Sequence, residues 1–297
     1  MKKILILTSG KKKKLTPFKL SLRNLQIDLT TASFNDVYSD SVSGDLLLKK
    51  GPAISRFEII YFRLVGKSLE TALLVAAYAK KNGIQIVDKI YENAQVLPIT
   101  QSKIKEMQAL KDAKITIPKT IFGSLDQIAQ KGPTVFRFPF VIKSSTGSRG
   151  REVYSPNNTT ELKSLITVLS KEEKLGKQFF AQEFVPTTKR IRVLIVGGQI
   201  IGSIVQLTKW RKRVTGYMPQ EDEKKIDKFT PTIEMQNLAK LAVVAVGIDI
   251  AGVDILVNEQ TGQSLVIEVN AAPSWKLIKK YCKVNVEYEI LKFIAKI

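Results

Sequence analysis

The chain has 297 residues, of which 44% are hydrophobic and 25% are charged, and this composition is typical of a globular protein. It carries 47 Lys and Arg against 27 Asp and Glu, a formal net charge of +20 that should attract polyanions and acidic substrates. No apolar run approaches the roughly 18 residues that cross a membrane, and the absence of histidine excludes Ser-His-Asp catalysis, Cys-His catalysis and His-ligated zinc.

Residues 1–97 are predicted to form a small N-terminal α/β domain. The chain opens with the apolar run Ile4–Leu7, which is too short for the core of a signal peptide and is expected to be a buried first strand. Apolar strands at 59–62 and 84–87 flank a helical pattern at 68–81. A strand, a helix and a second strand in this order predict a parallel sheet.

Residues 98–176 are predicted to form an α+β lid subdomain that begins with a helix near Thr100. Within it, the apolar strand Phe140–Lys143 ends in a cation and is followed by Ser144–Arg151, which is rich in Gly and Ser. Small residues permit tight turns and let backbone N–H groups approach a phosphate closely. The Gly-x-x-x-x-Gly-Lys-Ser/Thr order of a P-loop is absent, so a plain surface turn stays an alternative.

Residues 177–297 are predicted to form a C-terminal catalytic subdomain. Its apolar strands are expected at 178–186 and 191–198, and a helix is expected to start at Thr230-Pro231 and to end at Gly247. The charged stretch 209–228 is expected to be either a loop near the site or a solvated excursion.

The most informative pattern is a β-hairpin near the end of the chain, in which two apolar runs flank a polar loop of about five residues. If the loop is centred on Thr261, Asp254 lies opposite Glu268, and Asn270 shares the face of Glu268. One face would then carry two carboxylates and an amide, the oxygen donors that Mg²⁺ prefers and completes with phosphates and water. The alternative is a solvated strand face, although the flanking residues are too apolar for an exposed hairpin.

The order of these parts resembles the ATP-grasp superfamily and, within it, the RimK-like carboxylate–amine ligases. A strand ending in Lys143 is followed by a small-residue loop, a helix, the strand 178–186, an arginine-containing strand and the hairpin. The resemblance covers nearly the whole chain and is strongest from about Lys103 to Pro273. It implies an α/β, ATP-grasp fold in which an N-terminal domain stands beside two α+β subdomains that clamp ATP.

The resemblance also assigns roles to individual residues. The ATP contacts would be Lys103, Lys143, Gly147, Ser148, Arg149, Gly150, Glu183 and Phe184, the last two at the adenine hinge. The metal ligands would be Asp254, Glu268 and Asn270, and the catalytic residues would be Arg192 and Arg211. The N-terminal domain would help to hold the substrate, with Arg63 either a carboxylate contact or a solvated side chain.

The chain departs from the family pattern close to these residues. Arg190 stands where the family often has an acidic residue, and Arg213 stands where an asparagine is usual. Residues 271–276 replace the usual Ser-Pro-Gly, and their Pro-x-Trp-Lys ending resembles the methanopterin-glutamate ligase branch more than the ribosomal-protein-modifying branch. The predicted metal ligands and both lysines are retained.

The resemblance implies an ATP-dependent ligase that joins a carboxylate to an amine through an acyl phosphate, for example by adding glutamate to a small molecule or to a peptide or protein tail. ATP and Mg²⁺, or Mn²⁺ in its place, would be the cofactors, and the partners would be an acidic substrate, an amine acceptor and further copies of the chain. The single cysteine, Cys282, excludes an internal disulfide and fits a reducing cytoplasm.

Two other classes of function stay open. One is a non-catalytic, nucleotide-dependent binding protein, and the other is a basic ribosome- or RNA-binding module. A nucleic-acid role is disfavoured because aromatic residues do not alternate with the basic ones, as a platform for single strands requires. The excess of lysine is equally explained by a compositional bias expressed on solvated faces.

Overall fold

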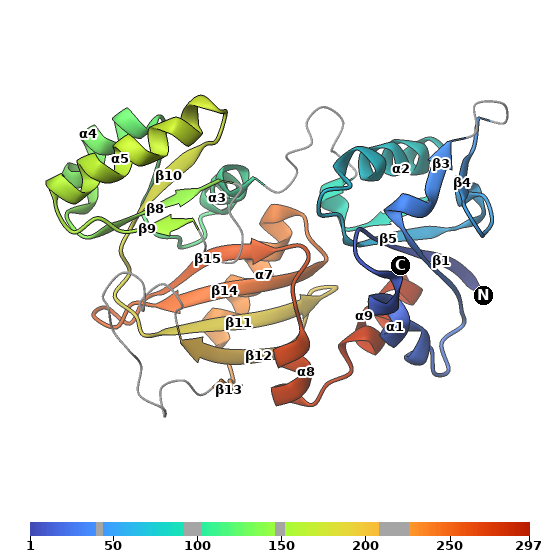
Figure 1. Cartoon of the computed structure of the whole chain (residues 1–297). Coiled ribbons are helices and arrows are strands. Elements are labelled where there is room, and N and C mark those ends of the chain that lie inside the picture. Colours follow the sequence, from blue (N-terminus) through green and yellow to red (C-terminus); the bar gives the residue numbers. More distant parts are fainter. Residues whose placement is uncertain (40–43, 92–101, 146–151, 208–225) are drawn as a thin grey trace.

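The computed structural model describes residues 1–39, 44–91, 102–145, 152–207 and 226–297. In this part of the chain, a parallel sheet, two antiparallel sheets and a short hairpin make a mixed α/β architecture (Figure 1). The predicted α/β class is therefore confirmed. None of the helices in the described ranges combines the length and the apolar character needed to cross a bilayer.

The N-terminal unit is built on a parallel sheet in the order β2-β1-β5-β6. Its strands are β1 (Lys2–Thr8), β2 (Ile27–Ser33), β5 (Ile59–Leu64) and β6 (Gln85–Val87). One face packs on α2 (Leu69–Lys81), and the other packs on α1 (Thr16–Leu20) and on α9 (Val286–Lys296) from the C-terminus. The parallel sheet and the helix predicted at 68–81 are thus confirmed.

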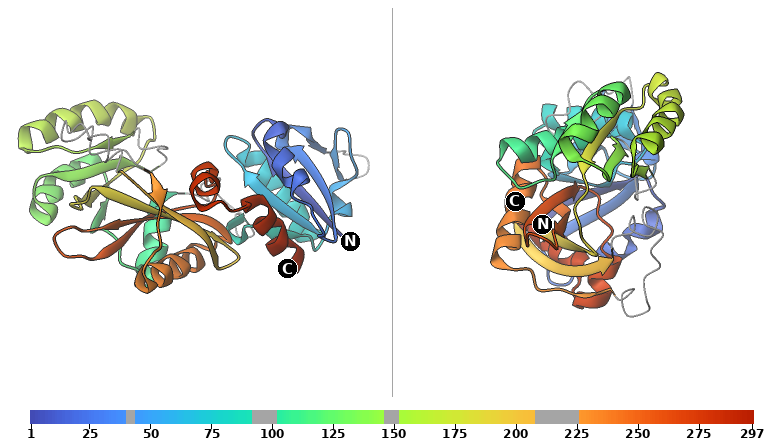
Figure 2. Two further views of the ribbon diagram at one scale, coloured as in Figure 1. Left: turned by 90° about the horizontal axis from the view of Figure 1, so that it is seen from below. Right: turned by 90° about the vertical axis from the view of Figure 1, so that its left-hand side faces the viewer.

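The last helix packs on the N-terminal sheet as well as on the subdomain to which the sequence pattern assigns it. Ile290 and Ile294 of α9 share an apolar cluster with Ile4 and Ile6 of β1, so α9 covers the N-terminal sheet. Figure 2 shows α9 beside the N-terminal unit and α8 (Lys276–Cys282) between that unit and the rest of the molecule. The last helix therefore packs on the first strand of the chain. The predicted division into residues 1–97, 98–176 and 177–297 stays a proposal.

The lid sheet is antiparallel and has the order β7-β10-β8-β9. Its strands are β7 (Thr120–Phe122), β8 (Phe140–Ser144), β9 (Val153–Tyr154) and β10 (Phe179–Glu183), covered by α4 (Leu125–Phe136) and α5 (Thr159–Lys174). Strand β10 belongs to this sheet although the predicted boundary at 176 places it in the next subdomain. Phe179 and Ala181 pack with Leu125 and Leu162, which holds β10 against the lid helices.

The five-stranded sheet has the order β13-β12-β11-β14-β15. Its strands are β11 (Lys189–Val196), β12 (Gln199–Leu207), β13 (Asp227–Lys228), β14 (Ile250–Val257) and β15 (Ser264–Asn270). Helices α3 (Lys103–Asp112) and α7 (Ile233–Val246) pack on one face. Helix α7 starts later than predicted, because Thr232 caps it by accepting from the N–H of Met235, and it ends at Gly247 as predicted.

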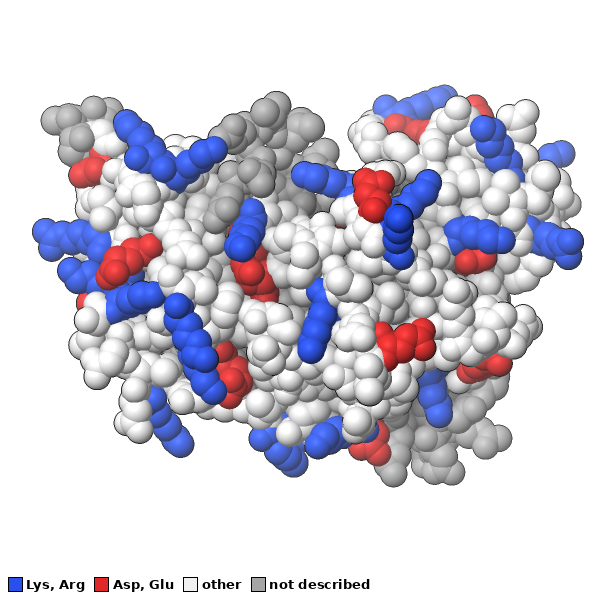
Figure 3. All heavy atoms as spheres, turned by 180° about the vertical axis from the view of Figure 1, so that it is seen from behind, with Lys and Arg blue, Asp and Glu red and all other residues white. Residues whose placement is uncertain are grey.

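The remaining described elements are short and lie within the first 91 residues. They are the hairpin of β3 (Val37–Ser39) and β4 (Leu46–Leu48) and the 3₁₀ turns Lys12–Leu15, Phe34–Asp36, Ile54–Arg56 and Lys89–Tyr91. Figure 3 shows one face of the whole molecule, where Lys and Arg side chains are spread out with Asp and Glu between them. On that face the basic residues do not gather into one patch.

Candidate active site

The predicted hairpin is formed by β14 and β15, and its register brings Asp254 opposite Glu268 and Gly252 opposite Asn270. The predicted pairing is confirmed, but its cause differs from the one expected. The loop spans the six residues 258–263, and β15 contains one extra residue, Ile267, at a bulge between the Ile255–Val266 and Asp254–Glu268 pairs. Such a bulge re-aims the side chains beyond it, so it turns Glu268 to the face opposite Val266.

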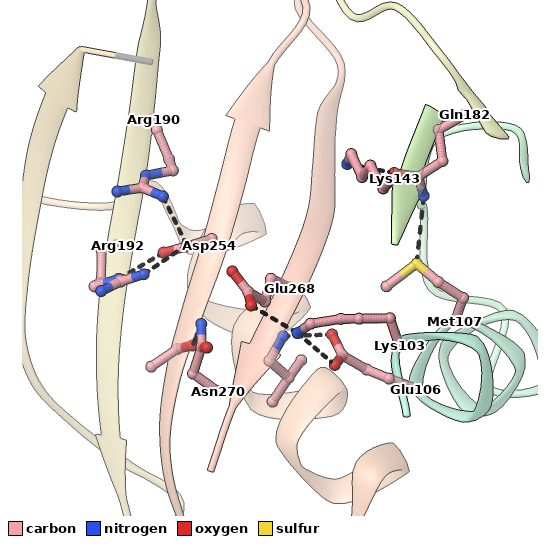
Figure 4. A network of polar contacts seen from close by, with 12 residues as sticks. Lys103, Glu106, Met107, Lys143, Gln182, Arg190, Arg192, Asp254, Glu268 and Asn270 are labelled. Carbon is pink, nitrogen blue, oxygen red and sulfur yellow. Dashed lines mark hydrogen bonds and ion pairs between the residues drawn. The ribbon is translucent and has the colours of Figure 1, made fainter. Parts of the chain in front are cut away.

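Asp254 is fully buried and is held by two arginines of β11 (Figure 4). Arg192 lies directly across the ladder and binds both carboxylate oxygens, with Nε to Oδ1 at 2.6 Å and a terminal nitrogen to Oδ2 at 2.7 Å. Arg190 donates to Oδ2 at 3.2 Å. Burial opposes the charged guanidinium, but the hydrogen bonds and charge of Asp254 raise the pKa of Arg192 above its ordinary value.

Glu268 is paired with a lysine from α3. Its Oε1 lies 2.7 Å from Nζ of Lys103, and the same Nζ lies 3.0 Å from Oε2 of Glu106. Burial alone would raise the pKa of Glu268, but Lys103 and a hydrogen bond with Asn270 hold it well below its usual range. Burial would lower the pKa of Lys103, and the two glutamates raise it instead. The predicted metal ligand and the predicted ATP lysine therefore neutralise each other here.

Lys143 reaches the same space from the lid sheet. Its Nζ donates to Oε1 of Gln182 at 2.6 Å, and the amide of Gln182 donates to Thr120 at 2.9 Å and to the sulfur of Met107 at 3.5 Å. Burial lowers the pKa of Lys143 to about 8, and the charge of Glu268 only partly opposes this shift. No ion pair of Lys143 with an acid is present among the described residues.

The predicted adenine hinge lies at the end of β10. The carboxylate of Glu183 accepts from the backbone N–H of Lys119 at 2.8 Å, and the N–H of Glu183 donates to the carbonyl of Lys119 at 3.0 Å. The Glu183 side chain therefore ties β10 to the segment before β7. Phe184 follows it and is partly buried. The role of both residues at adenine stays a prediction.

Several predicted residues lie outside the described ranges. They are Gly147, Ser148, Arg149, Gly150 and Arg211. Of the residues that depart from the family pattern, Arg190 and Trp275 lie within the described ranges, whereas Arg213 lies outside them.

Arg63 is partly buried against an aromatic ring rather than solvated, and its contact with a substrate carboxylate stays a prediction. Its guanidinium lies 3.8 Å from the ring centroid of Trp275 and donates to the carbonyl of Pro273 at 3.0 Å. The indole N–H of Trp275 donates to Glu287 at 3.0 Å. Arg63 thus joins the N-terminal sheet to the segment that directly follows Asn270, which is a structural contact rather than a free cation.

Two contributors to the site were not predicted from the sequence. Glu106 accepts from the N–H of Val269 at 2.6 Å as well as from Lys103, and Gln182 orients Lys143. The sequence signal for Glu106 was its position three residues after Lys103, on the same side of a helix. The signal for Gln182 was a polar residue within the apolar strand 179–183. Both patterns also occur on solvated surfaces.

The donor set of the hairpin fits a hard divalent cation in its chemistry. Asp254, Glu268 and Asn270 project oxygen donors from adjacent strands, and their charges are already compensated by Arg192 and Lys103. The described ranges contain no cluster of three or more His, Cys, Asp or Glu side chains that could hold a metal. A cation at this position would therefore need the Asn270 amide and oxygens from phosphate or water in addition to the two carboxylates.

Comparison with known proteins places this geometry in context. Residues 100–294 match the RimK-like ATP-grasp domain. The chain is 25% identical over 206 residues to a "Probable alpha-L-glutamate ligase" of Haemophilus influenzae, a match covering 68% of this chain and 65% of that protein. It is 28% identical over 200 residues to a protein of the same description from Trichodesmium erythraeum, covering 66% and 64%. The matched region thus spans less than two thirds of these relatives.

Solved structures match over the full length. The ATP-grasp ligase PsnB complexed with a minimal precursor has a TM-score of 0.73 and 17% identity, covering 100% of this chain and 99% of that one. A RimK domain ATP-grasp protein from Sphaerobacter thermophilus has a TM-score of 0.68 and 14% identity, covering 98% of both chains. A further PsnB complex contains Mg and ADP. The predicted ATP-grasp fold is therefore confirmed.

Proposed function

The chain belongs to the RimK-like ATP-grasp family of carboxylate–amine ligases, and from that premise we propose that it is itself an ATP-dependent ligase. The γ-phosphate of ATP would pass to a substrate carboxylate and give an acyl phosphate. The amine nitrogen would then bond to the acyl carbon, and the C–O bond to the phosphate would break, so that inorganic phosphate leaves with one former carboxylate oxygen. The products would be an amide, ADP and phosphate.

One observation carries this proposal. Two lysines from different elements, Lys103 on α3 and Lys143 on β8, converge on a sheet face that bears Asp254, Glu268 and Asn270 (Figure 4). Cations that can hold phosphate thus lie beside oxygen donors that can hold a divalent cation. This combination suits phosphoryl transfer, in which catalysis is mainly positioning and charge stabilisation.

Within this proposal each residue has a distinct task. Lys103 and Lys143 would bind ATP phosphates, and Arg192 would steady the transferring group with its planar guanidinium. Asp254, Glu268 and Asn270 would hold Mg²⁺, which when bound supplies positive charge to the phosphate oxygens. The roles expected for Gly147–Gly150, Glu183, Phe184 and Arg211 stay predictions.

For the substrate we propose an acidic molecule or peptide tail that receives an amino acid such as glutamate. The net charge of +20 supports an acidic substrate, because such a field speeds encounter with anions. The relatives named above are described as alpha-L-glutamate ligases, and PsnB was solved with a precursor peptide. The methanopterin branch, Mn²⁺ as an alternative metal, a cytoplasmic location and a homo-oligomer stay predictions.

The proposal is tested by ADP release. The protein with ATP and Mg²⁺ is offered glutamate together with short peptides that end in glutamate, aspartate or alanine, and ADP is measured with and without each partner. We expect release that requires both the peptide and the amino acid. Turnover independent of both would contradict the proposal, and strongly salt-dependent RNA binding without turnover would favour the nucleic-acid alternative.

A further inference from the structure

Glu106 links two parts of the site that lie on different elements. It is 7% exposed and has one partner on each carboxylate oxygen. Oε2 accepts from Nζ of Lys103 at 3.0 Å, and Oε1 accepts from the backbone N–H of Val269 at 2.6 Å. Val269 stands between Glu268 and Asn270 on the edge strand β15. A single carboxylate therefore connects the start of α3 to the backbone between two of the predicted metal ligands.

Lys103 is shared by two acids in this arrangement. Its Nζ lies 2.7 Å from Glu268 and 3.0 Å from Glu106, and 19% of its side chain is exposed. Lys103 has three N–H donors, and if Glu268 is to hold a divalent cation, Lys103 can turn the donor that it now gives to Glu268 towards a phosphate. Glu106 is the partner that it can keep, because the N–H of Val269 on β15 fixes its carboxylate beside Lys103 (Figure 4).

We propose that Glu106 is a positioning residue, which holds Lys103 beside Glu268 in the free protein and keeps it aimed at the site when Lys103 exchanges Glu268 for an ATP phosphate. This inference rests on the proposed function and adds a residue to it. In the free protein Lys103 supplies the counter-charge of Glu268. In the nucleotide complex Glu268 would be free to hold a cation, and Lys103 would pair with Glu106 and the phosphate. Loss of the Glu106 charge leaves Lys103 tied to Glu268 alone, which opposes that exchange.

The chain offers a matched control in Glu287. This buried carboxylate also accepts from one N–H group, the indole of Trp275 at 3.0 Å, and pairs with one lysine, Lys279 at 2.6 Å. It lies at the junction of the last two helices rather than among the site residues. Glu106→Gln and Glu287→Gln therefore make the same chemical change, and both leave an oxygen that can accept the N–H hydrogen bond.

Calorimetric titration with Mg·AMPPNP and with adenosine, together with thermal melting of the ligand-free protein, tests the role of Glu106. We expect Glu106→Gln to weaken Mg·AMPPNP by about tenfold, an order of magnitude that corresponds to one lost charged contact, and to leave adenosine binding unchanged. Glu287→Gln should lower the melting temperature and leave both affinities unchanged. Melting of Glu106→Gln within a few degrees of the wild type would support a role in the site.

Two results would overturn the inference. One is an unchanged affinity of Glu106→Gln for Mg·AMPPNP, and the other is an equal loss for both ligands with a lowered melting temperature, as a purely structural contact predicts. Failure of the wild type itself to bind Mg·AMPPNP would instead overturn the proposed function together with this inference. The two failures are therefore distinguishable.

Discussion

The five-stranded sheet has two faces of different chemistry on the same three strands. Towards α3 and α7 it presents an apolar face that includes Ile191, Val193, Val253, Ile255, Val266 and Val269. Towards the lid sheet it presents a charged face of Arg190, Arg192, Asp254, Glu268 and Asn270. Adjacent residues therefore differ in their surroundings: Ile255 packs in the apolar cluster, and Asp254 pairs with Arg192.

The difference teaches how stability and chemistry are separated in this protein. Apolar burial on one face stabilises the sheet in proportion to the area removed from water. Charges on the other face are costly to bury unless they are paired, and Asp254 and Glu268 are paired with Arg192 and Lys103. The cations that stabilise these acids are the ones proposed to bind phosphate. Changes on the charged face should therefore act on activity, and changes on the apolar face on stability.

The largest expected effect is on the charged face at Glu268. Glu268→Gln removes a carboxylate proposed to hold Mg²⁺, and we expect ADP release to fall by about a thousandfold or more, the scale of a lost electrostatic contact in a transition state. Lys103 keeps Glu106 as a partner, so the melting temperature should change little. Near-normal ADP release at saturating substrate would show that the hairpin is not the metal site.

Lys143 should affect the nucleotide more than the protein. Lys143→Ala is expected to weaken ATP by about tenfold to a hundredfold, because charged hydrogen bonds contribute about 1.5–3 kcal/mol, and to leave adenosine binding nearly unchanged. Calorimetric titration of the two ligands separates these cases. Equal losses would assign Lys143 a structural role.

The same lysine predicts a pH dependence. The pKa of Lys143 is lowered to about 8, so the free protein loses this charge as the pH rises through 8, and ATP affinity should fall over that range by at most about tenfold per pH unit. Between pH 8 and the ordinary lysine pKa, Lys143 is protonated in the unfolded chain and neutral in the folded protein. The contribution of Lys143 to the free energy of unfolding therefore rises with pH over this range. Weaker ATP binding at these pH values would thus not be explained by a loss of stability through Lys143. In Lys143→Ala the pH dependence of ATP affinity should disappear. If it persists in this variant, the dependence belongs to another group.

Arg192 tests the geometry of the charged face. Arg192→Lys keeps the charge and loses the planar fork that binds both oxygens of Asp254. We expect the catalytic rate to fall by at least about tenfold, roughly 1.4 kcal/mol of transition-state stabilisation, with little change in ATP affinity. An unchanged rate and affinity would reduce Arg192 to a structural ion pair with Asp254.

The smallest effect on activity is expected on the apolar face. Ile255→Val deletes one buried methylene next to Asp254, which should lower the free energy of unfolding by about 1 kcal/mol and leave the rate and the KM for ATP unchanged. Denaturant unfolding and ADP release on the same sample check both statements. A fall in rate without a loss of stability would break the separation between the faces.

Contacts between segments that are close in the sequence could be predicted, whereas contacts between distant segments could not. Centring the hairpin loop on Thr261 predicted the pairing of Asp254 with Glu268, but the bulge at Ile267 that makes it possible leaves no clear signal in the pattern. The apolar start of β10 suits either sheet, and packing with α4 and α5 holds this strand in the lid sheet. Strand order and helix packing join distant segments, which periodicity alone does not report.

For the side chains of the site, too, the residue types could be predicted but the distant contacts could not. The two lysines and the hairpin acids could be proposed because their residue types suit phosphate and metal chemistry. The contacts of Glu106 with Val269 and of Arg63 with Trp275 could not, because a glutamate on a helix and an arginine after a strand are usually solvated. Their partners, Val269 and Trp275, lie far along the chain and become neighbours only in the fold.

The central claim is that phosphate passes from ATP to a carboxylate on the charged face. The most direct measurement uses an acidic peptide whose carboxylates carry ¹⁸O, incubated with ATP, Mg²⁺ and glutamate, with the released phosphate examined by mass spectrometry. An acyl-phosphate reaction predicts phosphate that carries one ¹⁸O atom from the peptide, and predicts no such phosphate with Glu268→Gln. Phosphate released by the wild type without ¹⁸O would contradict the account, because the phosphoryl group would then not have passed through a carboxylate of the peptide.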